Sequence, residues 1–132
     1  MPNELLGRLV GCRLYSVQFV HDYVQLRFDG LGDDMPVLNC DVMPKVEHHP
    51  GSAIGDGEVG YADALRKLIP RIVTKTQERT GIGLRIEFDA EALVIHPTID
   101  ELPGPEIALL QGFDDGRWMC WRPGEDSFED LA

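Results

Sequence analysis

Apolar and polar side chains alternate along two neighbouring stretches, 15–19 and 24–28, near the start of the chain. The polar pair His21 and Asp22 separates them. Alternation with a period of two places every second side chain on one face of a strand, and a short polar break between two such stretches is typical of a turn. Residues 12–30 therefore predict an antiparallel β-hairpin with one buried face.

A similar pattern returns in the second half of the chain. With a shift of 59 residues, apolar positions of the two halves coincide, and one extra residue in the turn makes the shift 60. The coinciding pairs are Leu6 with Leu65, Leu9 with Leu68, Leu14 with Val73, Leu26 with Ile86 and Phe28 with Phe88. We interpret 3–44 and 62–97 as an internal repeat of a helix and three strands, with chance similarity of short amphipathic strands as the alternative.

Local signals place the remaining elements of the two halves. Asn3 can cap a first helix, and Pro70 ends a second one over 61–69. The stretch 44–60, which contains Pro50 and four glycines, predicts a long loop. Strands are expected over 37–43, 71–78 and 92–96. A kinked helix is the alternative for 71–78, but its β-branched residues favour a strand.

The end of the chain predicts a further hairpin over 106–122, because Asp114, Asp115 and Gly116 interrupt two apolar runs. The acidic tail 124–132 forms a last helical turn or frays. We therefore expect a single α+β domain over 1–132, with two pseudo-repeated α-β-β-β units and a C-terminal β-hairpin. They would form one mainly antiparallel sheet or a partly closed barrel with short helices.

Composition narrows the function classes. The 132 residues carry a formal net charge of -11, which repels nucleic acid and anionic membrane surfaces. No apolar run is long enough to span a membrane, and the start of the sequence lacks the pattern of a secretory signal. We expect a cytoplasmic protein that binds neither nucleic acid nor membranes. The odd and widely spaced cysteines, Cys12, Cys40 and Cys120, predict buried free thiols.

A polar cluster around 40–49 is the candidate metal site. Glu47, His48 and His49 offer ligands that a transition metal ion prefers, and His96 is a candidate from elsewhere in the chain. The spacing is poor, because adjacent histidines seldom converge on one ion, so solvated loop histidines are the alternative. We assign no metal ligand and expect no cofactor.

Two other motifs have structural readings. Residues 55–60 match G-x-G-x-x-G, but no strand precedes them and two acidic residues lie where phosphates would bind, so a linker is favoured over a nucleotide site. His21 and Asp22 fit a turn better than a catalytic dyad, since no one nucleophile is singled out. We expect no catalytic residue.

Trp118 and Trp121 are the candidate partner-binding residues. They are an odd number of positions apart, so a regular strand would place them on opposite faces, one in the core and one exposed. Aromatic side chains dominate the energetics of protein interfaces. An exposed tryptophan on a small acidic domain therefore favours binding to another protein.

The doubled pattern resembles small uncharacterised bacterial domain families. Leu-x-x-Leu leads into a hairpin that ends in Phe-Asp, and a strand closing on His96-Pro97 and the tryptophan hairpin follow. The resemblance implies no assigned chemistry, although some similar small acidic proteins act as immunity or regulatory partners of other proteins. We therefore expect a non-catalytic protein-binding module of regulatory, inhibitor or immunity type, with self-association possible. The alternatives are a metal-binding protein or metal-dependent enzyme using 40–49, and a small-molecule binder at the seam between the repeats.

Overall fold

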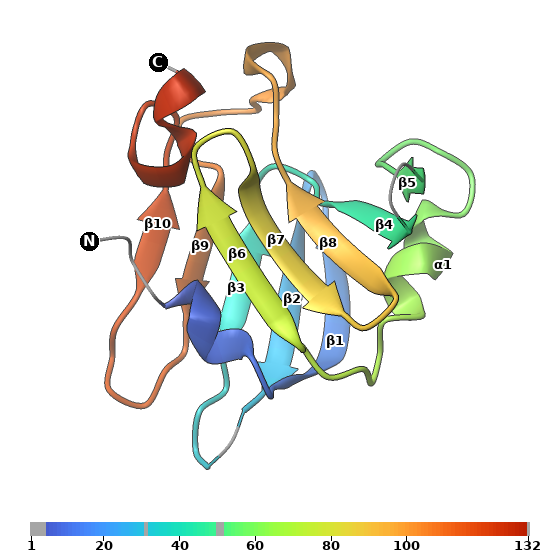
Figure 1. Ribbon diagram of the computed structural model, residues 1–132, viewed down its shortest axis with the longest axis vertical. Coiled ribbons are helices and arrows are strands. Elements are labelled where there is room, and N and C mark those ends of the chain that lie inside the picture. The colour runs from blue at the N-terminus through green and yellow to red at the C-terminus, as the bar shows by residue number, and fades with distance from the viewer. Residues whose placement is uncertain (1–4, 31, 50–51, 132) are drawn as a thin grey trace.

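The computed structural model describes residues 5–30, 32–49 and 52–131, with the side chain of His49 left out. Within them, ten strands form two five-stranded sheets that pack face to face, with short helical turns at the edges (Figure 1). Every pair of neighbouring strands is antiparallel. The predicted mixture of antiparallel sheet and short helices is confirmed, but the expectation of a single sheet is wrong.

The elements have the following bounds. The first sheet contains β1 (Arg13–Val20), β2 (Tyr23–Asp29), β3 (Val37–Cys40), β9 (Ala108–Gln111) and β10 (Met119–Trp121). The second contains β4 (Lys45–His49), β5 (Ser52–Ile54), β6 (Lys75–Arg79), β7 (Gly83–Phe88) and β8 (Glu91–Ile95). The helical segments are η1 (Leu6–Leu9), α1 (Tyr61–Arg66), η2 (Ile99–Glu101) and η3 (Asp126–Leu131). Asn3, the expected cap of the first helix, lies outside the described residues.

Each sheet combines strands from both halves of the chain. The first has the order β1-β2-β3-β9-β10 and the second β5-β4-β8-β7-β6. Three consecutive strands thus come from one half, and the hairpin beside them comes from the other. This strand order places β4 beside β8 and β9 beside β3, so residues that are distant in sequence meet where the two halves of the chain join.

The loop predicted over 44–60 is wrong, because β4 and β5 form a hairpin there. Val46 is fully buried on the inner face of β4, but Lys45 is exposed and Glu47 is half-buried. One buried apolar residue gives no detectable alternation. The pairing with β8 holds β4 in an extended conformation that the sequence pattern of β4 does not indicate.

The core lies between the two sheets and follows the predicted alternation. On β2 and β7, every second side chain is buried. Leucines of η1 and of the segment around α1 complete the same cluster. The inward residues of the two strands are Val24, Leu26, Phe28, Leu84, Ile86 and Phe88. The thiols of Cys12, Cys40 and Cys120 are buried, as predicted.

The segment after Pro70 is extended, as its β-branched residues predict. The β6 strand begins at Lys75, and Ile72 forms a bridge with Arg13 before it. The backbone N–H of Leu14 donates to the carbonyl of Arg71 over 3.0 Å. The alternative of a continuous kinked helix is therefore wrong. Among the described residues, no helix has the length and apolarity needed to cross a membrane.

Candidate functional site

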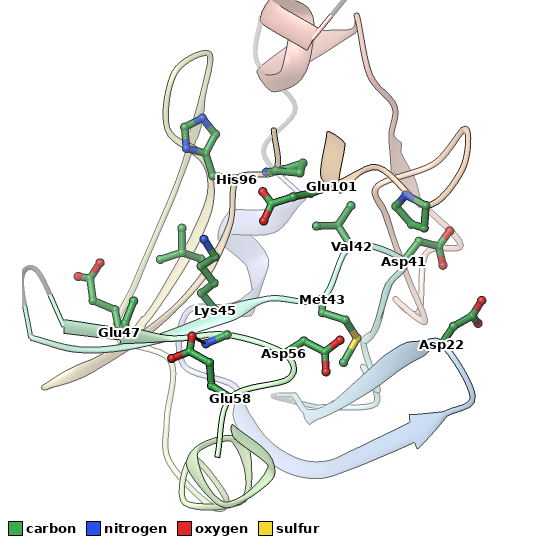
Figure 2. Close-up of a pocket in the computed structure, with 15 residues that line it drawn as sticks. Asp22, Asp41, Val42, Met43, Lys45, Glu47, Asp56, Glu58, His96 and Glu101 are labelled. Atoms are coloured by element: carbon green, nitrogen blue, oxygen red, sulfur yellow. Dashed lines mark hydrogen bonds between the residues drawn. The ribbon is translucent and has the colours of Figure 1, made fainter. Parts of the chain in front are cut away.

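A groove of about 680 Å³ lies at the junction of the two halves (Figure 2). One wall is formed by 41–47, which comprises the connection after β3 and the start of β4, and the other by the end of β8 and the residues after it. The turn of the β1–β2 hairpin and the segment before α1 complete it. Its acidic lining residues are Asp22, Asp41, Glu47, Asp56, Glu58 and Glu101. The β4–β5 hairpin pairs with β8, and this pairing brings the carboxylates together.

The acidic residues of the groove fall into two groups. Glu58 accepts a hydrogen bond from the backbone N–H of Gly55 over 2.9 Å, and Glu101 accepts one from the N–H of Thr98 over 2.9 Å. Glu47 forms an ion pair with Arg85. Within the described part of the chain, the remaining three carboxylates, Asp22, Asp41 and Asp56, form no ion pair. The groove therefore holds uncompensated negative charge.

Asp41 shows the effect of this charge. Burial raises the pKa of its carboxyl, and the negative charges of Glu106 and Asp22 raise it further. Like charges that face one another disfavour the ionised form of each. A cation bound near Asp41 and Asp22 would relieve that repulsion, so this end of the groove favours a positively charged ligand.

Two positively chargeable side chains also line the groove, Lys45 and His96. The pKa of Glu101 is lowered chiefly by its hydrogen bond from the Thr98 backbone, and also by Lys45 and His96. Figure 2 shows Lys45 and His96 on the side of Glu101, away from Asp22 and Asp41. The two ends of the groove therefore differ in charge.

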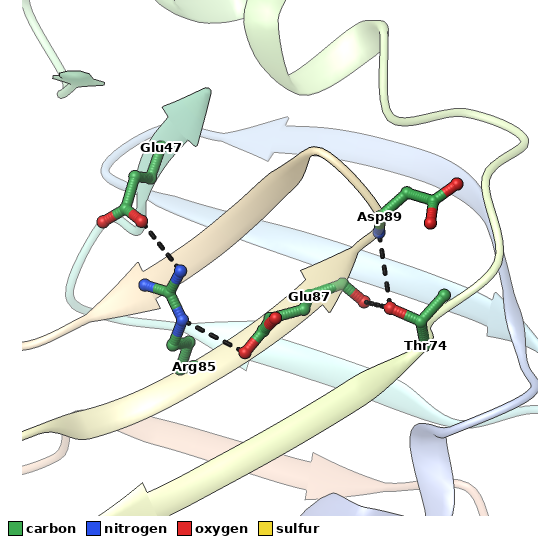
Figure 3. A network of polar contacts seen from close by, with 5 residues as sticks. All are labelled: Glu47, Thr74, Arg85, Glu87 and Asp89. Carbon is green, nitrogen blue, oxygen red and sulfur yellow. Dashed lines mark hydrogen bonds and ion pairs between the residues drawn. The ribbon is translucent and has the colours of Figure 1, made fainter. Parts of the chain in front are cut away.

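The metal candidates occupy different surroundings. Glu47 accepts a hydrogen bond from Arg85 Nη2 over 2.7 Å, and Arg85 Nε contacts Glu87 over 3.3 Å (Figure 3). The Arg85 guanidinium lowers the pKa of Glu47. His48 is half-buried in β4 and His96 lines the groove. Among the described residues, no three histidine, cysteine, aspartate or glutamate side chains lie so that they could hold one metal ion together.

Thr74 and Asp89 extend the polar contacts beside Glu87. The hydroxyl of Thr74 donates to the carbonyl of Glu87 over 3.3 Å and accepts a hydrogen bond from the N–H of Asp89 over 3.3 Å (Figure 3). These contacts tie the start of β6 to the end of β7. The Arg85 pairs show how a basic residue of 60–90 compensates acidic neighbours within the fold.

The two tryptophans lie in opposite environments. Trp121 is fully buried, and its Nε1–H donates to Glu78 Oε2 over 2.8 Å. Trp118 precedes β10 and is 62% exposed. Of the two candidate partner-binding residues, only Trp118 therefore presents its ring to solvent.

Glu78 provides a pH-dependent prediction. Its Oε1 is buried without a hydrogen-bond partner among the described residues. Burial raises the pKa of this carboxyl, the Trp121 hydrogen bond lowers it and Asp126 raises it, with a net upward shift. A carboxyl whose pKa is raised by folding stabilises the fold below its unfolded pKa, and this contribution is lost as the pH rises through the folded pKa.

We therefore expect Glu78→Gln, which keeps an oxygen acceptor for Trp121, to be more stable than wild type at pH 8. The difference in free energy of unfolding should shrink as the pH approaches 4, because wild-type Glu78 then becomes neutral. Urea unfolding at several pH values, followed by tryptophan fluorescence, measures it. A difference of the same size at every pH would contradict the expectation.

The sequence pattern does not indicate that Asp22, Asp41 and Asp56 share a groove. It predicts a turn at Asp22, which is confirmed, since Val20 and Tyr23 pair on either side. At Asp56 it indicates only a negative charge that disfavours phosphate binding. Neither residue carries a local signal for a shared site, because their proximity depends on the long-range pairing of β4 with β8.

Comparisons of the chain with protein-family models, curated proteins and solved structures give no significant match.

Proposed function

We propose that this chain is a non-catalytic protein-binding module that holds a segment rich in lysine and arginine in the acidic groove. The observation that carries the proposal is that three carboxylates along one groove, Asp22, Asp41 and Asp56, have no ion-pair partner among the described residues. Lysine and arginine form charge-assisted hydrogen bonds with carboxylates, and a complementary potential speeds association.

The charge of the whole chain supports the same partner chemistry. The net charge is -11, and residues 91–132 contain ten acidic and two basic side chains. A field of this sign attracts basic surfaces and repels acidic ones. Trp118, which is 62% exposed, is a second contact that we assign to the partner.

We further infer that the two halves are copies of one unit and that the groove lies at their seam. The two-residue turn between Val20 and Tyr23 corresponds to a three-residue turn between Arg79 and Gly83. This extra residue is the one that changes the sequence shift from 59 to 60. With that allowance, Gln18 opposite Gln25 corresponds to Gln77 opposite Arg85. The common register supports a duplication.

The test uses a fluorescently labelled peptide of alternating lysine and arginine, its glutamate-rich counterpart and spermine. The double variant Asp22→Asn, Asp41→Asn is compared with Asp33→Asn, Asp130→Asn. The control makes the same charge change at two exposed residues outside the groove. Binding is followed by fluorescence anisotropy at about 0.15 M salt, where long-range surface attraction is screened. Urea unfolding checks that each variant folds.

We expect saturable one-to-one binding of the basic peptide. The groove variant should weaken it about fivefold or more, because each solvent-accessible ion pair is worth up to about 1 kcal/mol. The control variant should bind as wild type does. Equal weakening in both variants would show attraction to the overall charge and overturn the groove as the site. Binding of spermine without the peptide would favour a small-molecule site and overturn the protein partner.

A further inference from the structure

The β1 strand forms an outer edge of the first sheet and is only partly covered. It is eight residues long and pairs with β2 on one side. On the other side, Ile72 forms a bridge with Arg13. The bond from the Leu14 N–H to the Arg71 carbonyl is the last described backbone hydrogen bond toward the end of β1 on this side. The outer edge of residues 15–20 therefore has no backbone partner in the described part of the chain.

The register shows which backbone groups face outward. Val20 and Tyr23 close a two-residue turn, so they form a hydrogen-bonded pair, and such pairs alternate along an antiparallel ladder. Gln18 and Gln25 are the next hydrogen-bonded pair, while Val17 and Phe19 lie at positions that do not bond to β2. The N–H and C=O groups of Val17 and Phe19 therefore point toward the free edge.

The other outer strands differ from β1. The equivalent strand β6 carries Lys75, Glu78 and Arg79 and packs against η1 and η3. The β5 and β10 strands are three residues each. Charged side chains, short edges and covering segments are the usual protection against edge pairing. Residues 14–20 of β1 contain no charged side chain, so this edge lacks the protection that charge gives.

We propose that the β1 edge pairs with the β1 strand of a second copy of the chain, antiparallel and centred on Gln18. This register places the outward groups of Val17 opposite those of Phe19 in the second copy, and the reverse pair follows by symmetry. Four backbone hydrogen bonds form, and the first sheets of the two copies become continuous. No other register centred within 16–20 uses both outward-facing residues in this way.

Side chains at the edge fit the same partner. Phe19 is 48% exposed, and its ring packs edge-on against Tyr61 with the ring centres 6.5 Å apart. In the dimer, Phe19 gains an apolar neighbour, Val17 of the second copy, across the strands. A second copy also explains why the edge carries neither acidic nor basic side chains. A charged side chain near the two-fold axis of the dimer would face the same charge on the second copy.

Cysteine cross-linking tests the register. Gln18 faces Gln18 of the second copy in a non-hydrogen-bonded pair, where Cα atoms are about 4.5 Å apart and a disulfide can form. Gln18→Cys should give a disulfide-linked dimer on oxidation with diamide, which takes up the two thiol hydrogens. Ser16→Cys is the matched control, because Ser16 would face Val20 of the second copy. The native cysteines are buried.

Sedimentation of the wild-type chain gives an independent measure. We expect the mass to rise from 14.7 kDa toward twice that value with concentration, and more strongly at high salt, because the net charge of -11 on each copy opposes association. Gln18→Lys should raise the dimer dissociation constant about tenfold or more, since it places like charges opposite each other. Its urea unfolding should match wild type.

A monomeric wild-type chain at all concentrations and salts would overturn the proposal. Equal cross-linking of Gln18→Cys and Ser16→Cys would also overturn it, because random collisions explain that result. A dimer that Gln18→Lys leaves intact would assign self-association to another surface. None of these outcomes bears on peptide binding in the acidic groove, so the two proposals fail separately.

Discussion

Replacing Phe88 with alanine is expected to lower the free energy of unfolding by about 3–5 kcal/mol, the usual range for deleting a fully buried aromatic ring. Phe88 is 1% exposed at the end of β7 and belongs to the cluster shared by both sheets. The substitution removes its contacts and leaves a cavity that the surrounding strands fill only in part. Urea unfolding monitored by circular dichroism measures the loss.

Phe28 provides a matched comparison for Phe88. It is fully buried near the end of β2, at the position that the sequence shift of 60 pairs with Phe88. If the two halves pack alike, Phe28→Ala should cost the same within about 1 kcal/mol, which is less than the spread among unrelated core sites. Phe19→Ala, at a ring that is 48% exposed, is the control and should cost about 1 kcal/mol or less. A small loss at Phe28 with a large one at Phe88 would contradict the equivalence.

The fold was predictable where periodicity is strong. The β2 and β7 strands follow from alternating side chains, because each has a buried face several residues long. The hairpin of β9 and β10 follows from the turn residues Asp114 to Gly116. Local rules suffice for these elements, since their partners are adjacent in sequence.

The placement of the β4–β5 hairpin beside β8, and of the β9–β10 hairpin beside β3, was not predictable in the same way. The β4 strand pairs with β8, which begins more than forty positions later in the sequence. Among the residues of β4 whose side chains are described, only Val46 is fully buried, and the half-buried Glu47 is stabilised by Arg85 of β7. Such an order arises from long-range pairing and a side-chain ion pair, and neither leaves a periodic signal in the sequence.

The candidate site depends on that unpredicted part of the fold. Asp41 precedes β4 and Asp56 follows β5, so the groove forms only when this hairpin joins the second sheet. The sequence did indicate an excess of acidic residues and an exposed tryptophan. The sequence could not indicate which carboxylates have a basic side chain as an ion-pair partner, because ion pairs such as Arg85 with Glu47 join residues far apart in the chain.

The junction of β7 with β8 offers the second large effect. Gly83 begins β7 with a φ angle of +76°, and a Cβ atom there would lie 2.2 Å from the carbonyl oxygen of Ile95. That oxygen belongs to the neighbouring strand, so it cannot move without disturbing the β7–β8 ladder. We expect Gly83→Ala to lower the free energy of unfolding by about 2–5 kcal/mol, from the left-handed backbone and the overlap together.

Gly81 separates the two causes. Its φ angle is +88°, but a Cβ atom there would meet nothing within 4 Å. Gly81→Ala should therefore cost only about 1–2 kcal/mol, the strain of a left-handed alanine. The difference between the two variants, measured by urea unfolding under the same conditions, isolates the overlap with Ile95. Equal losses would show that backbone strain alone acts at Gly83 and that β8 yields to the added methyl group, which would contradict the close packing of this strand pair.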